Sequence, residues 1–211
     1  MLAGMVDTIM LSTVGDSAVG AVGTANTYIG IFIIMFHVVS SGMIAVMTQY
    51  IGAKRIGVAY QARQLGAVFN AVIGVALSVF LYVFSENILE IVGVAPLLME
   101  YAKTYLKIVG GACFLNALIP IFSSYLRAFG HTRQPLAATV AANILNLCLN
   151  AVFLFVFRFG VAGVAAATVI SRVVNLVLVM IFSKLLVKAN EDSERLKNKE
   201  VFAQIIRVGL P

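Results

Sequence analysis

The residues best suited to chemistry are a few polar side chains set into long apolar stretches. Asp7 is the one carboxylate that we place inside such a stretch. A carboxylate surrounded by hydrocarbon either binds a cation such as sodium as a hard oxygen ligand or exchanges a proton. Both reactions couple transport to an ion gradient. The alternative is that Asp7 caps a broken helix or lies near the membrane interface.

Three asparagines, Asn143, Asn146 and Asn150, follow one another at helical spacing. Offsets of three and four residues place their amides on one face of a helix. They either line an aqueous cavity and offer carbonyl oxygens to a cation, or form hydrogen bonds between packed helices. Thr168, in the next apolar stretch, is a weaker candidate because a threonine hydroxyl also bonds back to its own helix.

Arg172 and His37 also fall deep within apolar stretches. Arg172 is a candidate counter-ion for Asp7 or a substrate contact, although its long side chain can also reach the interface. His37 has a side chain suited to proton exchange, yet a single histidine is also common as hydrogen-bonded structure. The sequence contains no HExxH, GxSxG or phosphate-loop motif. We therefore expect neither an enzyme nor a cofactor beyond a coupling ion.

These side chains stand out because the other residues are so apolar. Of the 211 residues, 61% are hydrophobic and only 11% are charged, and the mean hydropathy is +1.00. A soluble domain has about a quarter of its residues charged, so that class is excluded. The apolar residues form runs of roughly twenty, long enough to cross a bilayer as helices. The predicted fold class is therefore all-α, a polytopic transmembrane helix bundle.

Six apolar runs predict six spans, at residues 1–14, 24–48, 65–84, 105–126, 136–157 and 162–186. The first is too short to cross the bilayer, so we expect the chain to begin inside a helix. Residues 85–104 predict a loop with short interfacial helical pieces. The expected organisation is a transmembrane lobe over residues 1–186, a hydrophilic linker over 187–200, and the start of a seventh helix over 201–211.

The net charge of +6 does not indicate nucleic acid, because the basic residues gather at the ends of apolar runs. The loops after the second, fourth and sixth spans hold most of them: Lys54, Arg55, Arg63, Arg127, Arg133, Lys184, Lys188, Arg195, Lys197, Lys199 and Arg207. The other side has Lys103, Lys107 and Arg158. Since basic residues are retained on the cytoplasmic side, both chain ends are expected there.

Five short motifs follow in order along the chain. They are VDTIM (6–10) with VGDS (14–17) and AVG (21–23), then QYIGAKR (49–55), RAFGHTRQP (127–135), NILNLCLN (143–150), and GVAG (160–163) with ATVIS (167–171). They resemble the first helix and loop, the loop after helix two, the loop between helices four and five, helix five and the start of helix six of the multidrug and toxic compound extrusion (MATE) family. The resemblance covers essentially the whole chain.

The resemblance implies a cation-coupled antiporter in the plasma membrane that exports drugs and other organic, often cationic, compounds. Two six-helix lobes would enclose a cavity that opens alternately to either side. The residues that match the family's sodium- or proton-linked site are Asp7, Asn146, Asn150 and Thr168. Asn150 stands where that site has a second carboxylate, which leaves the coupling ion open. The chain accounts for the N-terminal lobe alone, as a fragment or as a half that pairs with another.

Two other functions remain open at this stage. A flippase for lipid-linked oligosaccharides belongs to the same broad fold group, but it would favour several basic residues in the cavity to hold phosphates, and here only Arg172 is available. A non-transporting structural fragment is the third reading, since one lobe alone offers half a cavity.

Overall fold

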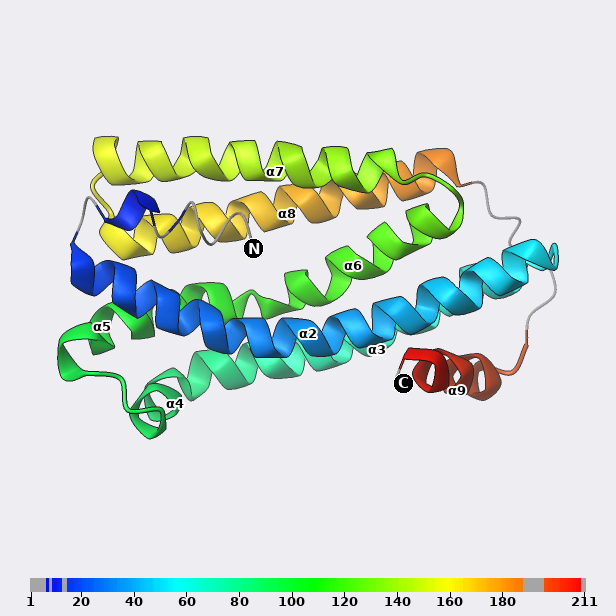
Figure 1. Ribbon diagram of the computed structural model, residues 1–211, viewed down its shortest axis with the longest axis horizontal. Coiled ribbons are helices and arrows are strands. Elements are labelled where there is room, and N and C mark those ends of the chain that lie inside the picture. Colours follow the sequence, from blue (N-terminus) through cyan, green and yellow to red (C-terminus); the bar gives the residue numbers. More distant parts are fainter. Residues whose placement is uncertain (1–6, 8, 13–14, 188–195, 210–211) are drawn as a thin grey trace. The chain divides into compact units, whose positions relative to one another are not determined.

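The computed structural model describes residues 7, 9–12, 15–187 and 196–209. Within these ranges every regular element is a helix (Figure 1), which confirms the all-α fold class. The elements are α2 (Asp16–Gly52), α3 (Ile56–Val83), α4 (Ser85–Ile91), α5 (Pro96–Tyr105), the π-helix η1 (Leu106–Gly110), α6 (Cys113–Ala128), α7 (Arg133–Ala151), the π-helix η2 (Val152–Val156), α8 (Gly160–Leu186) and α9 (Asn198–Gly209).

Four described helices are long and apolar enough to cross a membrane: α2, α3, α7 continued by η2, and α8. A fifth span combines Pro96–Gly110 with Cys113–Ala128, two pieces bent by 42°. These five correspond to the spans predicted after the first. The predicted first span, residues 1–14, lies largely outside the described residues, as do residues 188–195 of the predicted linker and 210–211 at the chain end.

The helices extend beyond the predicted spans. α2 begins at Asp16 rather than at residue 24, and α3 begins at Ile56 rather than at residue 65. With 37 residues, α2 is about 55 Å long at 1.5 Å per residue, well over the roughly 30 Å of hydrocarbon. Hydropathy therefore located the apolar segments of these helices but not their polar ends, where backbone hydrogen bonding continues.

The expected short helical pieces between the third and fourth spans are α4 and α5. Lys103 of α5 donates a hydrogen bond to Glu86 of α4 and forms an ion pair with it. This hydrogen bond and the charge of Lys103 hold the pKa of Glu86 below its ordinary value. The two short helices are therefore tied to each other at the start of the fifth span.

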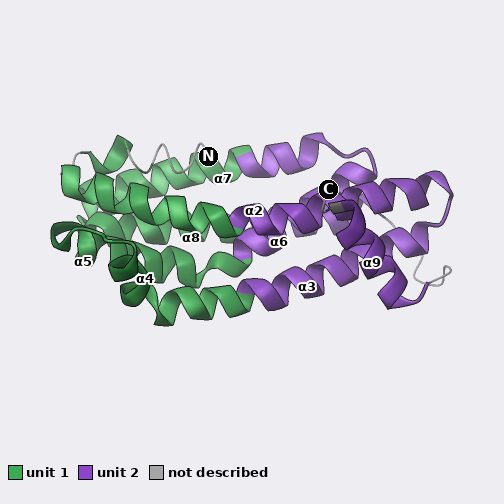
Figure 2. Cartoon of the chain, turned by 60° about the horizontal axis from the view of Figure 1, so that its bottom comes forward, with its two compact units in different colours: residues 1–32, 75–114, 140–174 green, residues 33–74, 115–139, 175–211 purple. Residues whose placement is uncertain are grey.

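The chain separates into two compact units, each assembled from three segments (Figure 2). Unit 1 comprises Met1–Phe32, Val75–Phe114 and Val140–Val174, and unit 2 comprises Ile33–Gly74, Leu115–Thr139 and Asn175–Pro211. The boundaries fall inside long helices, so each long helix contributes one part to each unit. Every residue of the Asp7 environment described below belongs to unit 1.

In unit 2, α9 packs its apolar side against α2 and α3. Val201 and Ile205 are fully buried, and the ring centroids of Phe69 and Phe202 lie 4.8 Å apart. The hydroxyl of Tyr50 donates to Gln204 Oε1 at 2.9 Å. An apolar face on an otherwise polar helix is typical of helices that lie at an interface.

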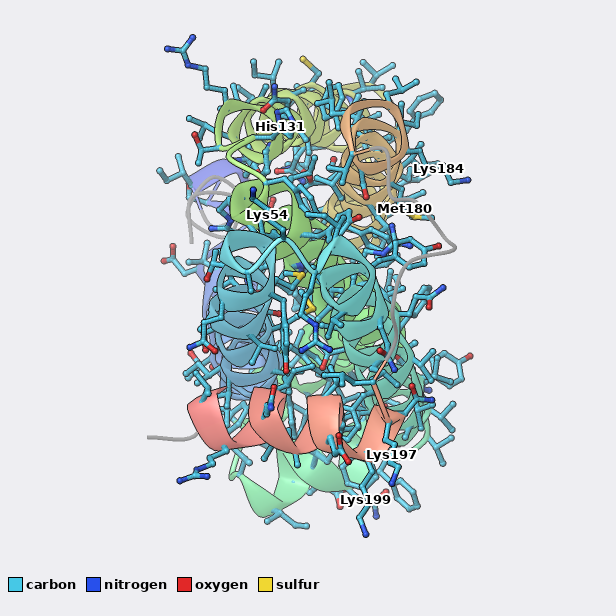
Figure 3. The ribbon with its side chains drawn as sticks, turned by 90° about the vertical axis from the view of Figure 1, so that its right-hand side faces the viewer. Lys54, His131, Met180, Lys184, Lys197 and Lys199 are labelled. Atoms are coloured by element: carbon cyan, nitrogen blue, oxygen red, sulfur yellow. The ribbon has the colours of Figure 1, made fainter. Side chains whose placement is uncertain are left out.

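Unit 2 holds 11 of the 15 Lys and Arg residues, several of them in or beside the connections between its helices. Figure 3 shows Lys54 from the α2–α3 turn, His131 from the α6–α7 loop and Lys184 from the end of α8 at the end of unit 2 that is turned toward the viewer. The figure also shows α9, which begins near Lys197 and Lys199, running across the direction of α2 and α3. The clustering matches the side predicted to be cytoplasmic, and its orientation in a membrane stays a prediction.

In unit 1, the small residues at the start of α8 allow close packing, as their composition predicts. Val164, Ala165 and Ala167 are fully buried. A methyl group added at Gly163 would lie 2.9 Å from the Cβ atoms of both Phe153 and Phe159. Only a glycine lets α8 approach the end of η2 this closely.

Candidate functional site

Asp7 lies at the centre of a hydrogen-bonded cluster in unit 1. It is 1% exposed and is the one charged residue among the buried polar side chains of the described chain. Asn150 Nδ2 donates to Asp7 Oδ1 at 2.7 Å, and Thr168 Oγ1 donates to Oδ2 at 2.9 Å. The hydroxyl of Tyr105 lies 3.4 Å from the same Oδ2. Both carboxylate oxygens therefore have donors from helices distant in sequence.

A second set of hydrogen bonds holds these donors in place. Asn150 Nδ2 also lies 3.3 Å from Asn146 Oδ1, and Asn146 Nδ2 donates to Thr168 Oγ1 at 3.4 Å. The hydroxyl of Tyr105 lies 3.1 Å from Asn26 Oδ1. Thr168 thus accepts from one neighbour and donates to the carboxylate, which fixes the direction of its single hydroxyl hydrogen.

The sequence places these groups through ordinary helix geometry. Asn146 and Asn150 are four residues apart on α7 and so lie on one face. Thr168 lies on α8, where the buried small residues of the first turns let the helix approach its neighbours. Tyr105 is the last residue of α5, directly before η1, and π-helical turns commonly occur at functional sites.

The arrangement fits a site for a small hard cation or a proton. Its groups are one carboxylate, amide oxygens and hydroxyls, the ligand types that hard cations prefer. Asn150 Oδ1 is buried and receives no hydrogen bond from the described residues, so one carbonyl oxygen beside the carboxylate has unused acceptor capacity. Among the described residues, no three His, Cys, Asp or Glu side chains lie close enough to hold a transition metal.

Arg172 is near the cluster but not hydrogen-bonded to it. Its Nη1 atom is buried and has no hydrogen-bond partner among the described residues. Its positive charge acts on Asp7 at longer range. The structure therefore agrees with a role as a distant counter-ion more than with a direct ion pair.

Two other predicted residues are not brought into the cluster. Asn143 is half-buried on α7, and none of the described hydrogen bonds joins it to Asp7. His37 is exposed on α2, belongs to unit 2 and has Arg127 as its charged neighbour. Of the three asparagines predicted to share a helical face, Asn146 and Asn150 therefore belong to the cluster and Asn143 does not.

Sequence reasoning missed Tyr105 and Asn26. Tyr105 falls at the predicted edge of a span, where a tyrosine is usually an interface residue. Asn26 is a single amide near the start of a predicted span and has no partner at helical spacing. Asn26 is nevertheless a polar residue inside an apolar run, the same signal that identified the other asparagines.

Comparison with known proteins decides the family. A sequence model of the MatE family matches residues 1–152. The chain belongs to the MatE family. The resemblance inferred from the five motifs is confirmed, and the named relatives of this MatE chain are transporters rather than enzymes.

Relatives match the MatE chain over its full length or most of it. The uncharacterized transporter YisQ of Bacillus subtilis is 32% identical over 100% of this chain and 48% of its own length. The probable multidrug resistance protein NorM of Thermotoga maritima is 29% identical over 83% of this chain and 39% of its own length. The chain thus spans about half the length of the curated relatives it matches.

Solved structures agree on the fold. A multidrug resistance MATE family transporter in an inward-facing conformation matches with a TM-score of 0.88 and 24% identity. The match covers 100% of this chain and 48% of that one. The MatE chain therefore has the fold of one lobe of a two-lobe, multi-pass membrane transporter.

The cluster predicts a specific cost for removing one donor. Thr168→Val keeps the shape of the side chain but leaves Asp7 Oδ2 without its shortest hydrogen bond. We expect the thermal unfolding of the purified protein to show a loss of about 1.5 to 3 kcal/mol, the usual range for hydrogen bonds to charged groups.

The matched control is Thr24→Val. The Thr24 hydroxyl donates to Gly20 O of its own helix at 2.9 Å, and this bond serves no buried charge. We expect it to cost less than about 1 kcal/mol. Equal destabilisation by both variants would show that Thr168 does not stabilise the carboxylate.

Proposed function

We propose that this chain is one lobe of a cation-coupled antiporter that exports drugs and other organic compounds. The Asp7 cluster carries the proposal. Burying a carboxylate that only uncharged donors hold costs stability, and ionisable residues inside membrane spans are retained where they have a function. The relatives named as a probable multidrug resistance protein and as a multidrug export protein support the substrate class. We assign the coupling site to Asp7, Asn146, Asn150 and Thr168, with Tyr105 as a further member.

Coupling in this site would act through the charge of Asp7. While the carboxylate is ionised, donors from α5, α7 and α8 converge on it. A bound cation or proton neutralises that charge and weakens the attraction that holds these hydrogen bonds. Because the donors lie on three different elements, the change in charge alters how these elements pack together within unit 1.

A carboxylate surrounded by amide and hydroxyl groups suits either sodium or a proton as the coupling ion. For sodium, the ligands would be the Asp7 carboxylate with neutral oxygens, including the unused Asn150 Oδ1. For a proton, Asp7 alone would be the acceptor. A single carboxylate with amide neighbours carries one negative charge at most, which suits a monovalent ion in either case.

The proposed transport cycle needs a second lobe. In transporters built from repeats, the substrate binds between the repeats and access alternates as one moves against the other. We therefore propose that this lobe works with a second six-helix lobe, on the same chain or another, around an organic and often cationic substrate. Asn143, Arg172 and His37 stay candidates for lining the cavity.

The basic end of unit 2 would face the cytoplasm of a plasma membrane. The segments that follow the second, fourth and sixth predicted spans carry 11 of the 15 Lys and Arg residues. Lys and Arg are retained on the cytoplasmic side of short loops. The linker and both ends of the lobe then lie on that side.

The first test is Asp7→Asn in the two-lobe transporter. The amide cannot carry the coupling charge, so we expect drug efflux from cells to fall to the level of cells without the transporter, while the amount of protein in the membrane is unchanged. Asp16→Asn is the matched control, because Asp16 is exposed at the start of α2 and should keep full efflux. Unchanged efflux in Asp7→Asn would remove Asp7 from the mechanism.

Collapsing the two gradients separately in the unsubstituted transporter identifies the ion. Loss of export only without the sodium gradient would assign a sodium site to Asp7 and its amide neighbours. Loss only without the proton gradient would make Asp7 a proton carrier. Absence of export under every condition would contradict the efflux proposal and favour the flippase.

The second test concerns orientation. In a background with Cys113 and Cys148 replaced by alanine, we introduce Lys199→Cys on α9 and Glu90→Cys on α4, both at exposed positions. A membrane-impermeant thiol reagent added to intact cells should label Glu90→Cys and leave Lys199→Cys unlabelled until the cells are opened. Labelling of Lys199→Cys in intact cells would reverse the proposed orientation.

A further inference from the structure

Unit 1 contains an apolar cavity of about 330 Å³ that the proposed transport function does not use. It lies between α3 and the break that separates η1 from α6, and its lining residues are Val75, Ser78, Val79, Tyr82, Gly111 and Phe114. The volume is at the lower end of the range for sites that bind small molecules. None of the Asp7 cluster residues takes part in the lining.

The helix break creates the cavity and leaves it apolar. Gly111 has no side chain, and a Cβ atom there would lie 3.3 Å from Tyr82 Cδ2, so a larger residue would press against the wall. A break exposes backbone N–H groups, which are costly in hydrocarbon. Here Phe114 N donates to Ser78 Oγ at 2.9 Å, so one of these N–H groups is satisfied by a side chain of the lining.

The cavity runs from the end of a span toward its middle. Tyr82 is the residue before the last of α3, where tyrosines mark the membrane interface. Val75 lies seven residues earlier, about 10 Å deeper along the helix. Val75, Val79 and Tyr82 are 51%, 58% and 57% exposed. In a membrane-spanning helix, a cavity opening beside such exposed side chains is accessible to acyl chains.

The positive charge of Lys107 lies at the end of the cavity formed by Tyr82. Lys107 Nζ lies 5.9 Å from the centroid of the Tyr82 ring, and Lys107 is one helical turn before Gly111. Lys103, one turn earlier still, is neutralised by Glu86. Lys107 forms no ion pair with any carboxylate of the described residues. Glu86 of α4 acts on Lys107 only from beyond ion-pair distance, so the ammonium group can pair with an anion at the level of the interface.

We propose that this cavity binds an anionic phospholipid, with one acyl chain along Val75, Val79 and Phe114 and the phosphate at Lys107. An apolar groove about 10 Å long, open at the surface and with a single cation at one end, matches the two parts of such a lipid. A cationic drug finds no carboxylate in the lining, and a zwitterionic lipid would bring a second positive charge toward Lys107 together with its phosphate.

The test measures binding by thermal stabilisation of the purified two-lobe transporter in detergent. Phosphatidylglycerol and phosphatidylcholine of the same chain length are titrated separately, and glycerol phosphate is titrated as the headgroup alone. We expect phosphatidylglycerol to bind about tenfold more tightly than phosphatidylcholine and glycerol phosphate to have no effect. Lys107→Gln should remove the difference between the two lipids.

Two further variants separate the parts of the site. Val79→Trp fills the cavity and should weaken binding of both lipids while Lys107 is intact. Lys184→Gln, which removes a lysine at the end of α8 in unit 2, should leave the preference for phosphatidylglycerol unchanged. Equal binding of both lipids to the unsubstituted protein, full stabilisation by glycerol phosphate, or an unaltered preference in Lys107→Gln would each overturn the proposal.

Discussion

The arrangement of unit 1 depends on keeping the carboxylate of Asp7 in apolar surroundings. A buried charge without partners costs several kcal/mol, so every oxygen of this group needs a donor. Among the described residues that need is met without a salt bridge, through one amide and one hydroxyl at short range and a tyrosine further out. Because these donors are uncharged and Arg172 acts only from a distance, no cation is paired directly with the carboxylate, which is the property a site for a cation or proton requires.

Other features of unit 1 follow from bringing these donors together. α7 and α8 must approach closely for Asn150 and Thr168 to reach the same carboxylate, and the buried small residues of α8 permit that approach. Tyr105 joins the cluster at the point where α5 passes into a π-helix. The break that follows, between η1 and α6, forms the cavity on the side of α3. Deviations from regular helix thus occur near both the cluster and the cavity.

Much of this was accessible from the sequence, for physical reasons. Apolar runs of about twenty residues reveal spans because a bilayer imposes that length, and helical periodicity placed Asn146 and Asn150 on one face. The helix ends were missed because helices continue past the hydrocarbon, where hydropathy carries no signal. Tyr105 and Asn26 were missed because their roles depend on which spans become neighbours. The packing of α9 against α2 and α3 and the exposure of His37 were also missed, because they too depend on which helices become neighbours.

The most direct test of the central claim is the infrared difference spectrum of the purified transporter between sodium-containing and sodium-free buffer, and between acidic and alkaline pH. A cation or proton that binds at Asp7 changes the carboxylate stretching bands under one of these exchanges. The account predicts that this change disappears in Asp7→Asn and persists in Asp16→Asn. An identical difference spectrum in Asp7→Asn would contradict the claim that Asp7 is the coupling group.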